Sequence, residues 1–180
     1  MTDTDKKLRE VVGHAFANAP ATRARFERAG ITPDDIQGAA DLPKLPILPK
    51  DEVVAMQSSD PPFGGLLAVP PEEVSHIFFS PGPLYEPGPA QDDSAWDTAV
   101  AILKKIGFQP GDVVLNSFAY HLVPAGWLFD VALTRLGCTV IPGGVGNSDL
   151  QLQMMRDLGC TGYAGTPSFL MSLIRKAEEN

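Results

Sequence analysis

The sequence predicts an α/β protein: a mostly parallel β-sheet between two layers of helices, preceded by a small helical segment. Three observations lead to this fold class. Short apolar runs alternate with amphipathic stretches after residue 72, which is the pattern of βα units. The apolar runs carry almost no charge, as expected of parallel strands that are covered on both faces. Seventeen glycines and seventeen prolines fall mostly between these segments, where they mark turns.

Residues 1–71 are predicted to form short helices, because apolar residues recur there every three or four positions. The expected helices are 5–18, 21–29 and 50–57. The second should stop at Gly30, since glycine readily takes the left-handed conformation at a helix end. Helices this short cannot bury a core alone. We therefore expect 1–71 to be a lead-in that packs on the βα region of 72–180, so that residues 1–180 form a single domain.

In residues 72–180, four apolar runs alternate with four amphipathic stretches. The predicted strands are 74–80, 112–118, 138–142 and 161–165, and the predicted helices are 93–108, 124–136, 148–158 and 167–178. This order implies right-handed crossovers and parallel pairing. The acidic pair Asp92 and Asp93 is expected to mark the start of the first of these helices.

The composition limits the classes of partner. With 14 Lys and Arg against 22 Asp and Glu, the net charge of −8 argues against nucleic acid or an anionic membrane surface. No apolar run approaches the roughly 20 residues needed to cross a bilayer. The polar N-terminus and only two cysteines, Cys138 and Cys160, lead us to expect a cytoplasmic protein with both thiols in the core. Neither the cysteines nor the three histidines are spaced as metal ligands, so no metal site is predicted.

Residues 76–88 are the most informative segment. An apolar run ends in a loop rich in Ser, Gly and Pro, and a helical pattern follows from about residue 92. Such strand–loop–helix junctions bind phosphate in α/β proteins, through loop N–H groups and the helix N-terminus. However, Pro81, Pro83 and Pro87 have no N–H to donate, and Glu86 adds a negative charge. The segment therefore predicts a nucleotide-site scaffold with an altered phosphate loop.

Several segments carry a family resemblance in order and spacing. They are residues 26–31, 41–46, 62–64, 111–114, 136–142, 155–159 and 165–169. They resemble the N-terminal region of phenylacetate–CoA ligases, members of the AMP-forming adenylating superfamily. The resemblance implies the N-terminal domain fold of acyl- and aryl-CoA synthetases. It also implies activation of a small aromatic carboxylic acid with ATP to an acyl-adenylate, then transfer to CoA, with ATP or AMP, Mg²⁺ and CoA as cofactors.

Two departures from the family bear on activity. The family's phosphate loop, Ser-Ser-Gly-Thr-Thr-Gly-Lys-Pro, is matched here at Ser80, Gly82 and Pro87, but Glu86 replaces its Lys and reverses the local charge. The chain also ends before the family's later acidic, ribose-binding and lysine motifs. We therefore expect a portion of a ligase that is inactive alone. The alternative is a non-catalytic small-acid-binding module, or the partner of a separate C-terminal half, and an exposed last strand could also promote self-association.

The candidate acid site follows the second strand, because ligands of open α/β sheets collect at the carboxyl ends of strands. By the resemblance, Tyr120, His121, Ala125 and Gly126 would line the acid pocket: the small residues leave room for a ring, Tyr120 stacks on it and His121 could hold a carboxylate. The other interpretation is a helix start with aromatic residues in the core. The remaining histidines are expected to be structural, His76 at a sheet edge and His14 on the surface.

Two further loops are candidates. Gly144, in the glycine-rich residues 143–147, is expected by the resemblance to border the active-site cleft; a tight turn without a ligand is the alternative, and a dinucleotide site lacks the Gly-x-Gly-x-x-Gly spacing. By the same resemblance, the nucleotide would contact Thr166 and the remnants of the phosphate loop, Ser80 and Gly82. A helix cap explains the Thr166 hydroxyl equally well.

Overall fold

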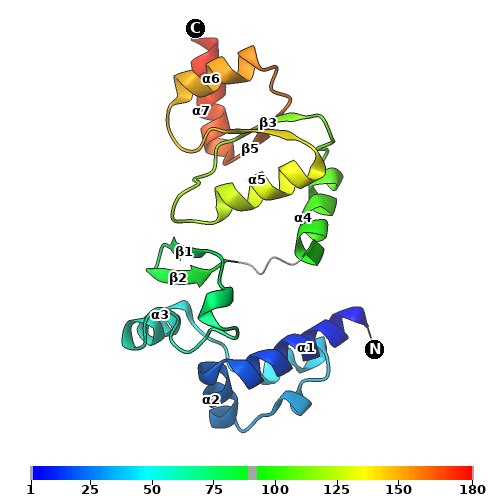
Figure 1. The fold of residues 1–180 in the computed structure, drawn as a ribbon, viewed down its shortest axis with the longest axis vertical. Helices are drawn as coiled ribbons and strands as arrows, with labels where there is room; N and C mark the ends of the chain where they lie inside the picture. Colours follow the sequence, from blue (N-terminus) through cyan, green and yellow to red (C-terminus); the bar gives the residue numbers. More distant parts are fainter. Residues whose placement is uncertain (1, 89–92, 180) are drawn as a thin grey trace. The chain divides into compact units, whose positions relative to one another are not determined.

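The structure of the chain is a computed structural model that describes residues 2–88 and 93–179. They belong to two compact units, Met1–Ala90 and Gln91–Asn180 (Figure 1). This boundary falls later in the chain than the change of sequence pattern near residue 72. The single domain that we expect for residues 1–180 stays a prediction.

The first unit begins with the predicted short helices. Its elements are α1 (Asp3–Asn18), α2 (Pro20–Ala29), η1 (Pro33–Asp35), η2 (Ala39–Lys44), α3 (Lys50–Ser59) and η3 (Pro71–Glu73). Val12, Phe26 and Ile36 form a small core of their own in this unit. As expected, α2 ends at Gly30, which has the left-handed φ of 66°. His14 is exposed on α1, as predicted.

An antiparallel hairpin corrects one predicted element. β1 (Ile77–Ser80) pairs with β2 (Leu84–Pro87), and Ser80 lies opposite Leu84. The prediction of a parallel strand over 74–80 that runs through a loop into a helix was wrong. The residues Pro81-Gly82-Pro83 turn the chain back at once, with Gly82 at φ 143°, and Leu84 then becomes buried. His76 precedes this hairpin, is exposed, and stacks on the Phe78 ring.

The second unit contains the predicted parallel sheet. Its elements are α4 (Asp93–Lys105), β3 (Val113–Asn116), α5 (Ala125–Leu136), β4 (Thr139–Pro142), α6 (Ser148–Asp157), β5 (Gly162–Ala164) and α7 (Pro167–Glu178). The strand order is β4-β3-β5 and both pairings are parallel, so the α/β fold class is confirmed, with three strands in this sheet. The helix start predicted at Asp92 lies outside the described residues. The side chain of Asp93 is not described either.

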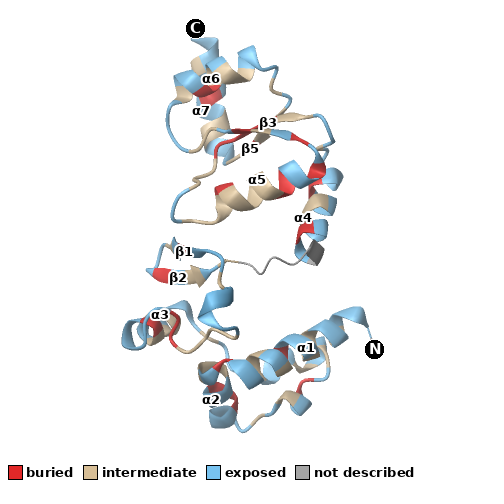
Figure 2. Ribbon diagram, in the orientation of Figure 1, coloured by how far each residue is buried: buried red, intermediate tan, exposed pale blue. Residues whose placement is uncertain are grey.

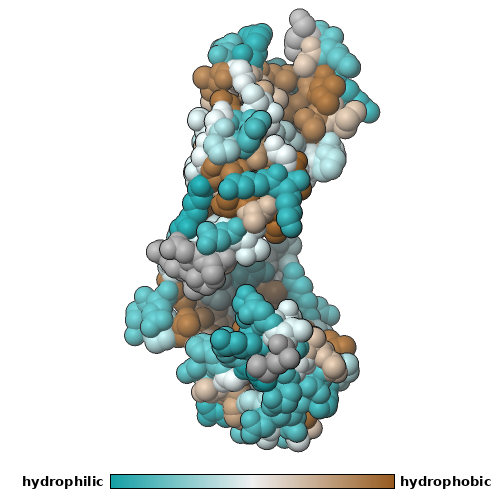
Figure 3. Space-filling model, turned by 90° about the vertical axis from the view of Figure 1, so that its right-hand side faces the viewer, coloured by the Kyte–Doolittle hydropathy of each residue, from teal (hydrophilic) through white to brown (hydrophobic). Residues whose placement is uncertain are grey.

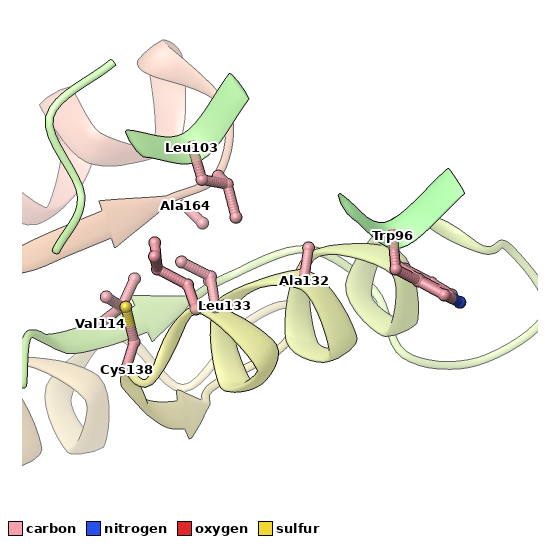
Figure 4. Close-up of a cluster of buried hydrophobic side chains, with 8 residues drawn as sticks. Trp96, Leu103, Val114, Ala132, Leu133, Cys138 and Ala164 are labelled. Carbon is pink, nitrogen blue, oxygen red and sulfur yellow. The ribbon is translucent and has the colours of Figure 1, made fainter. Parts of the chain in front are cut away.

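Two layers of helices cover the sheet, as predicted. On one face Val114 and Ala164 pack with Leu103 of α4 and Leu133 of α5 (Figure 4). On the other, Leu115 and Ile141 pack with Leu173 of α7, and residues of α6 join them. Neighbouring residues of β3 therefore point into different cores, because side chains alternate along a strand. Figure 2 shows these buried positions in red along β3 and α5.

The two thiols of this unit differ in burial. Cys138 is buried, and this burial, with a smaller effect of Asp112, raises the pKa of its thiol; Cys160 is half-buried.

On the face of the molecule shown in Figure 3, hydrophobic surface is interrupted by hydrophilic side chains. Within the described residues, the helices are too short or too polar to cross a bilayer.

Candidate functional site

The candidate site lies at the carboxyl ends of β3, β4 and β5, which meet at one edge of the parallel sheet. Asn116, the last residue of β3, is in register with Pro142 of β4 and Ala164 of β5. Three connections leave this edge: residues 117–124 to α5, 143–147 to α6, and 165–166 to α7. Six of the eight predicted site residues are in or next to these connections, as the rule for open α/β sheets leads one to expect.

Asn116 holds two of these connections together. It is fully buried, and its Nδ2 donates hydrogen bonds to the Tyr120 hydroxyl at 2.8 Å and the Gly126 carbonyl at 2.9 Å. Its Oδ1 accepts from the Phe118 N–H at 3.2 Å, and its backbone carbonyl accepts from the Gly144 N–H at 3.0 Å. The predicted residues Tyr120, Gly126 and Gly144 are therefore gathered around one buried amide that the sequence analysis did not single out.

Tyr120 is half-buried, and both hydrogen-bonding functions of its hydroxyl have partners. The hydroxyl accepts from Asn116 and donates to the Asp130 carboxylate at 2.8 Å. Burial of the phenol raises its pKa above the ordinary value, and the hydrogen bond and charge of Asp130 raise it further, against a smaller opposing effect of Asn116. Asp130, on α5, was also missed, because nothing local in the sequence links positions 120 and 130.

Gly126 was expected to leave room for a ring of the acid, but the backbone of Ala119 fills the space beside it. Its N–H donates to the Ala119 carbonyl at 2.9 Å, and a Cβ placed on it would lie 2.4 Å from that same oxygen. The space that a side chain would need is thus filled by the backbone of the preceding connection. Ala125, the first residue of α5, is half-buried, and His121 is exposed.

The glycine-rich connection is held by Gln151, a buried residue of α6. Its Nε2 faces the carbonyls of Gly143, Gly144 and Gly146 at 3.3, 3.0 and 2.7 Å. Its Oε1 is buried and has no hydrogen-bond partner within the part of the chain that the structure describes. Gly144 itself has φ 60°, so this loop needs the conformational freedom of glycine at the predicted position.

Thr166 begins α7. Its hydroxyl accepts a hydrogen bond from the Phe169 N–H at 3.4 Å, which is a helix cap, and its carbonyl accepts from the Tyr163 hydroxyl at 3.2 Å. Ser117 joins this end of β5 to β3, because its Oγ lies 2.8 Å from the Tyr163 hydroxyl. The cap accounts for the hydroxyl of Thr166 without a ligand.

Ser80 and Gly82 belong to the first unit, at the turn of the hairpin. The Ser80 hydroxyl donates to the Glu86 carboxylate at 2.5 Å, and Lys50 Nζ donates to the Pro81 carbonyl at 2.6 Å. The serine and the lysine thus both have partners within the protein, and Glu86 places a negative charge beside the turn. Since prolines also remove N–H donors here, this hairpin does not fit a phosphate group.

Another pocket, outside the carboxyl ends of the strands, has less suitable chemistry. An apolar groove of 230 Å³ lies between α4 and α5; Ile102, Ile106, Leu128 and Phe129 are among its lining residues, none of which could hold a carboxylate. For a metal ion, residues 2–88 and 93–179 contain no cluster of three or more His, Cys, Asp or Glu side chains.

The comparisons with known proteins point to one group of enzymes. No protein-family model matches the sequence. Over 178 residues the chain is 34% identical to a phenylacetate–coenzyme A ligase of Pseudomonas putida and 31% identical to one of Aromatoleum evansii, with 96% of this chain covered in each case. A crystal structure of a 2-hydroxyisobutyryl-CoA ligase, in an open conformation in complex with 2-HIB-AMP and CoA, matches 98% of the chain with a TM-score of 0.90 and 26% identity. The chain spans 39% of the length of each of these proteins.

Proposed function

This chain corresponds to the N-terminal portion of the phenylacetate–coenzyme A ligase family over nearly its whole length. From this premise we propose that it supplies the acid-binding part of an acyl- or aryl-CoA ligase. The complete reaction would activate a small carboxylic acid, aromatic by the sequence resemblance, as an acyl-adenylate and pass the acyl group to CoA. The observation that carries the proposal is the sequence match, which includes the connections at the carboxyl edge of the sheet.

The acid would lie against the connections that follow β3 and β4. In this proposal Tyr120 supplies an aromatic surface, Ala125 and Gly144 border the acid, and His121 is available to its carboxylate. The buried Asn116 supports this role, because it holds Tyr120, the start of α5 and Gly144 by direct hydrogen bonds. Preorganised surroundings of this kind reduce the entropy that a site loses when it binds a ligand.

We propose that the chain by itself does not form the acyl-adenylate. The Ser80 hydroxyl is bound to Glu86, whose negative charge opposes a phosphate, and Lys50 Nζ donates to the Pro81 carbonyl. ATP, Mg²⁺ and CoA therefore enter the proposal only through the family, and Thr166, Ser80 and Gly82 are proposed nucleotide contacts on that basis alone. A C-terminal ligase portion would have to supply the remaining machinery.

The second candidate function is a small-acid-binding module without catalysis, or the partner of a separate C-terminal half. The contact between Ser80 and Glu86 favours it, because the carboxylate of Glu86, on β2 next to the turn, opposes the binding of nucleotide phosphates. The two functions differ in what the chain should bind. A module should bind the acid alone, whereas a ligase portion should bind the acid and gain nucleotide binding when the missing portion is supplied.

The test is the thermal stability of the purified chain with phenylacetate, benzoate, 2-hydroxyisobutyrate, ATP·Mg²⁺, AMP and CoA. A ligand at a hundredfold excess over its Kd should stabilise the fold by about 2.7 kcal/mol. We expect stabilisation by an acid and none by ATP·Mg²⁺, with no pyrophosphate exchange. Exchange catalysed by the chain alone would disprove its proposed inactivity, and a lack of response to every acid would contradict the acid site.

A further inference from the structure

The Tyr120 hydroxyl makes one hydrogen bond as a donor and one as an acceptor. A phenol has one proton to donate, and here that proton goes to Asp130 Oδ2 at 2.8 Å. Its oxygen accepts from Asn116 Nδ2, also at 2.8 Å. The hydroxyl is therefore satisfied on both sides by the protein, while the residue as a whole remains half-exposed.

The two partners are held by regular structure. Asn116 ends β3, is fully buried, and uses the rest of its amide on the Gly126 carbonyl and the Phe118 N–H. Asp130 lies on α5, the helix that contains Gly126. The hydroxyl end of Tyr120 is thus fixed towards the buried amide, and what a ligand can contact is the aromatic ring.

We propose that Asp130 and Asn116 are positioning residues that fix Tyr120 so that the site presents the ring, and not the hydroxyl, to a bound acid. The site then selects acids that place apolar or aromatic carbon against Tyr120. A hydroxyl at that position would lose its hydrogen bonds to water and find no partner, which costs binding free energy. This inference rests on the proposed acid site and specifies its substrate class further.

The first experiment tests the anchoring without any ligand. With three tyrosines in the chain, ¹³Cζ-labelled tyrosine allows each phenol to be titrated by NMR, and Tyr120→Phe identifies the signal. Tyr120 should titrate above the ordinary pKa of about 10 in the wild type and at a lower pH in Asp130→Asn, because the variant removes a negative charge beside the phenol. The control Asp97→Asn, at an exposed position of α4, should leave the Tyr120 signal unchanged. A Tyr120 titration that Asp130→Asn does not alter would overturn the anchoring.

The second experiment tests the selectivity, by calorimetry with phenylacetate and 4-hydroxyphenylacetate on the full chain. The wild type should bind phenylacetate at least about tenfold more tightly, the scale expected for an unpaired buried hydroxyl. Tyr120→Phe keeps the ring but loses the two hydrogen bonds that fix it, so it should lose less affinity for phenylacetate than Tyr120→Leu, which should lose about tenfold because it also removes the ring.

The outcomes separate this inference from the function on which it rests. Equal affinities for the two acids would overturn the selectivity, since a hydroxyl on the ligand would then have found a partner in the site. A loss of phenylacetate affinity in Tyr120→Phe as large as that in Tyr120→Leu would contradict a contact between the acid and the ring. If neither acid binds but the titration behaves as expected, the proposed acid site is wrong and the selectivity falls with it, while the anchoring of Tyr120 stands. Circular dichroism of each variant at the same pH distinguishes these effects from unfolding.

Discussion

At the scale of single residues, the site depends on a few buried polar groups. Asn116 uses its carbonyl oxygen, its amide oxygen and both amide protons, so each of its polar groups stabilises a different part of the surrounding backbone. Gln151 holds the glycine-rich connection with its Nε2 alone, because its Oε1 is buried without a partner among the described residues. A hydrogen bond of such a buried amide contributes about 1 kcal/mol net, whereas removing its partner costs about 1–3 kcal/mol, because a buried polar group is left unsatisfied.

Two glycine-to-alanine substitutions compare a crowded position, Gly126, with an open one, Gly13. In Gly126→Ala the new Cβ would lie 2.4 Å from the Ala119 carbonyl oxygen, so we expect a loss of about 2 kcal/mol in unfolding free energy from overpacking. Gly13 lies in α1 with nothing within 4 Å of a Cβ, so Gly13→Ala should stabilise the protein by about 0.5 kcal/mol through helix propensity. Urea denaturation measures both. Equal effects at the two positions would contradict the close approach at Gly126.

The raised pKa of Tyr120 predicts an effect of alkaline pH. A phenol whose folded pKa exceeds its unfolded value of about 10 stabilises the fold fully below that pH and loses the contribution as the pH rises through the folded pKa. The unfolding free energy of the wild type should therefore fall more steeply above pH 10 than that of Tyr120→Phe. Denaturant titrations at a series of pH values measure the difference. Parallel curves for the two proteins would show that the phenol is not perturbed.

At the scale of elements, a glutamine of α3 completes the hairpin. Gln57 is buried, its Nε2 donates to the Tyr85 carbonyl at 2.8 Å, and its Oε1 accepts from the Tyr85 N–H at 2.8 Å. The side chain thus pairs with β2 as a neighbouring strand would. This contact explains how a two-stranded hairpin, marginal in isolation, is kept in place.

Removing that contact should loosen β2. We expect Gln57→Ala to cost about 2 kcal/mol of unfolding free energy, because two backbone groups of Tyr85 lose their partners. The amide of Tyr85 should also exchange with solvent faster in native-state hydrogen exchange. Gln153→Ala, at an exposed position of α6, is the control and should change stability by less than about 0.5 kcal/mol. Unchanged exchange at Tyr85 would argue against the pairing.

At the scale of the whole molecule, the cores are divided between the two units. Val12, Phe26 and Ile36 form a core within Met1–Ala90, while the cores around Leu133 and Leu173 lie within Gln91–Asn180. Each unit therefore has apolar burial of its own. Local opening of a protein follows such contiguous groups of buried contacts.

Shortening a buried side chain should therefore destabilise mainly the unit that contains it. Phe26→Ala and Leu133→Ala should each cost about 3 kcal/mol, because both side chains are buried among apolar neighbours. Hydrogen exchange should lose protection mainly in residues 2–88 for the first variant and mainly in residues 93–179 for the second. A uniform loss of protection over both units in either variant would show that the chain opens as one cooperative unit.

The local pattern of the sequence predicted most of the helices and the three strands of the parallel sheet, but not β2. Apolar runs without charge located β3, β4 and β5, and a glycine located the end of a helix at Gly30. The sequence also determined where the candidate site would lie, because the ends of parallel strands meet at one edge whatever their side chains. These features depend on the local periodicity of hydrophobic residues, which a single sequence displays directly.

Only the tertiary structure decided which polar groups meet. The hydrogen bonds of Asn116, the contact of Tyr120 with Asp130, and the pairing of Gln57 with Tyr85 join different elements, and no local pattern encodes such meetings. The antiparallel pairing of residues 77–87 also depends on the tertiary structure. Their apolar pattern fits a parallel strand as well as a hairpin, and the burial of Leu84 and the hydrogen bond from Ser80 to Glu86 belong to the folded chain alone. Pairing partners are chosen by packing in three dimensions, which is why the strand was predicted but its partner was not.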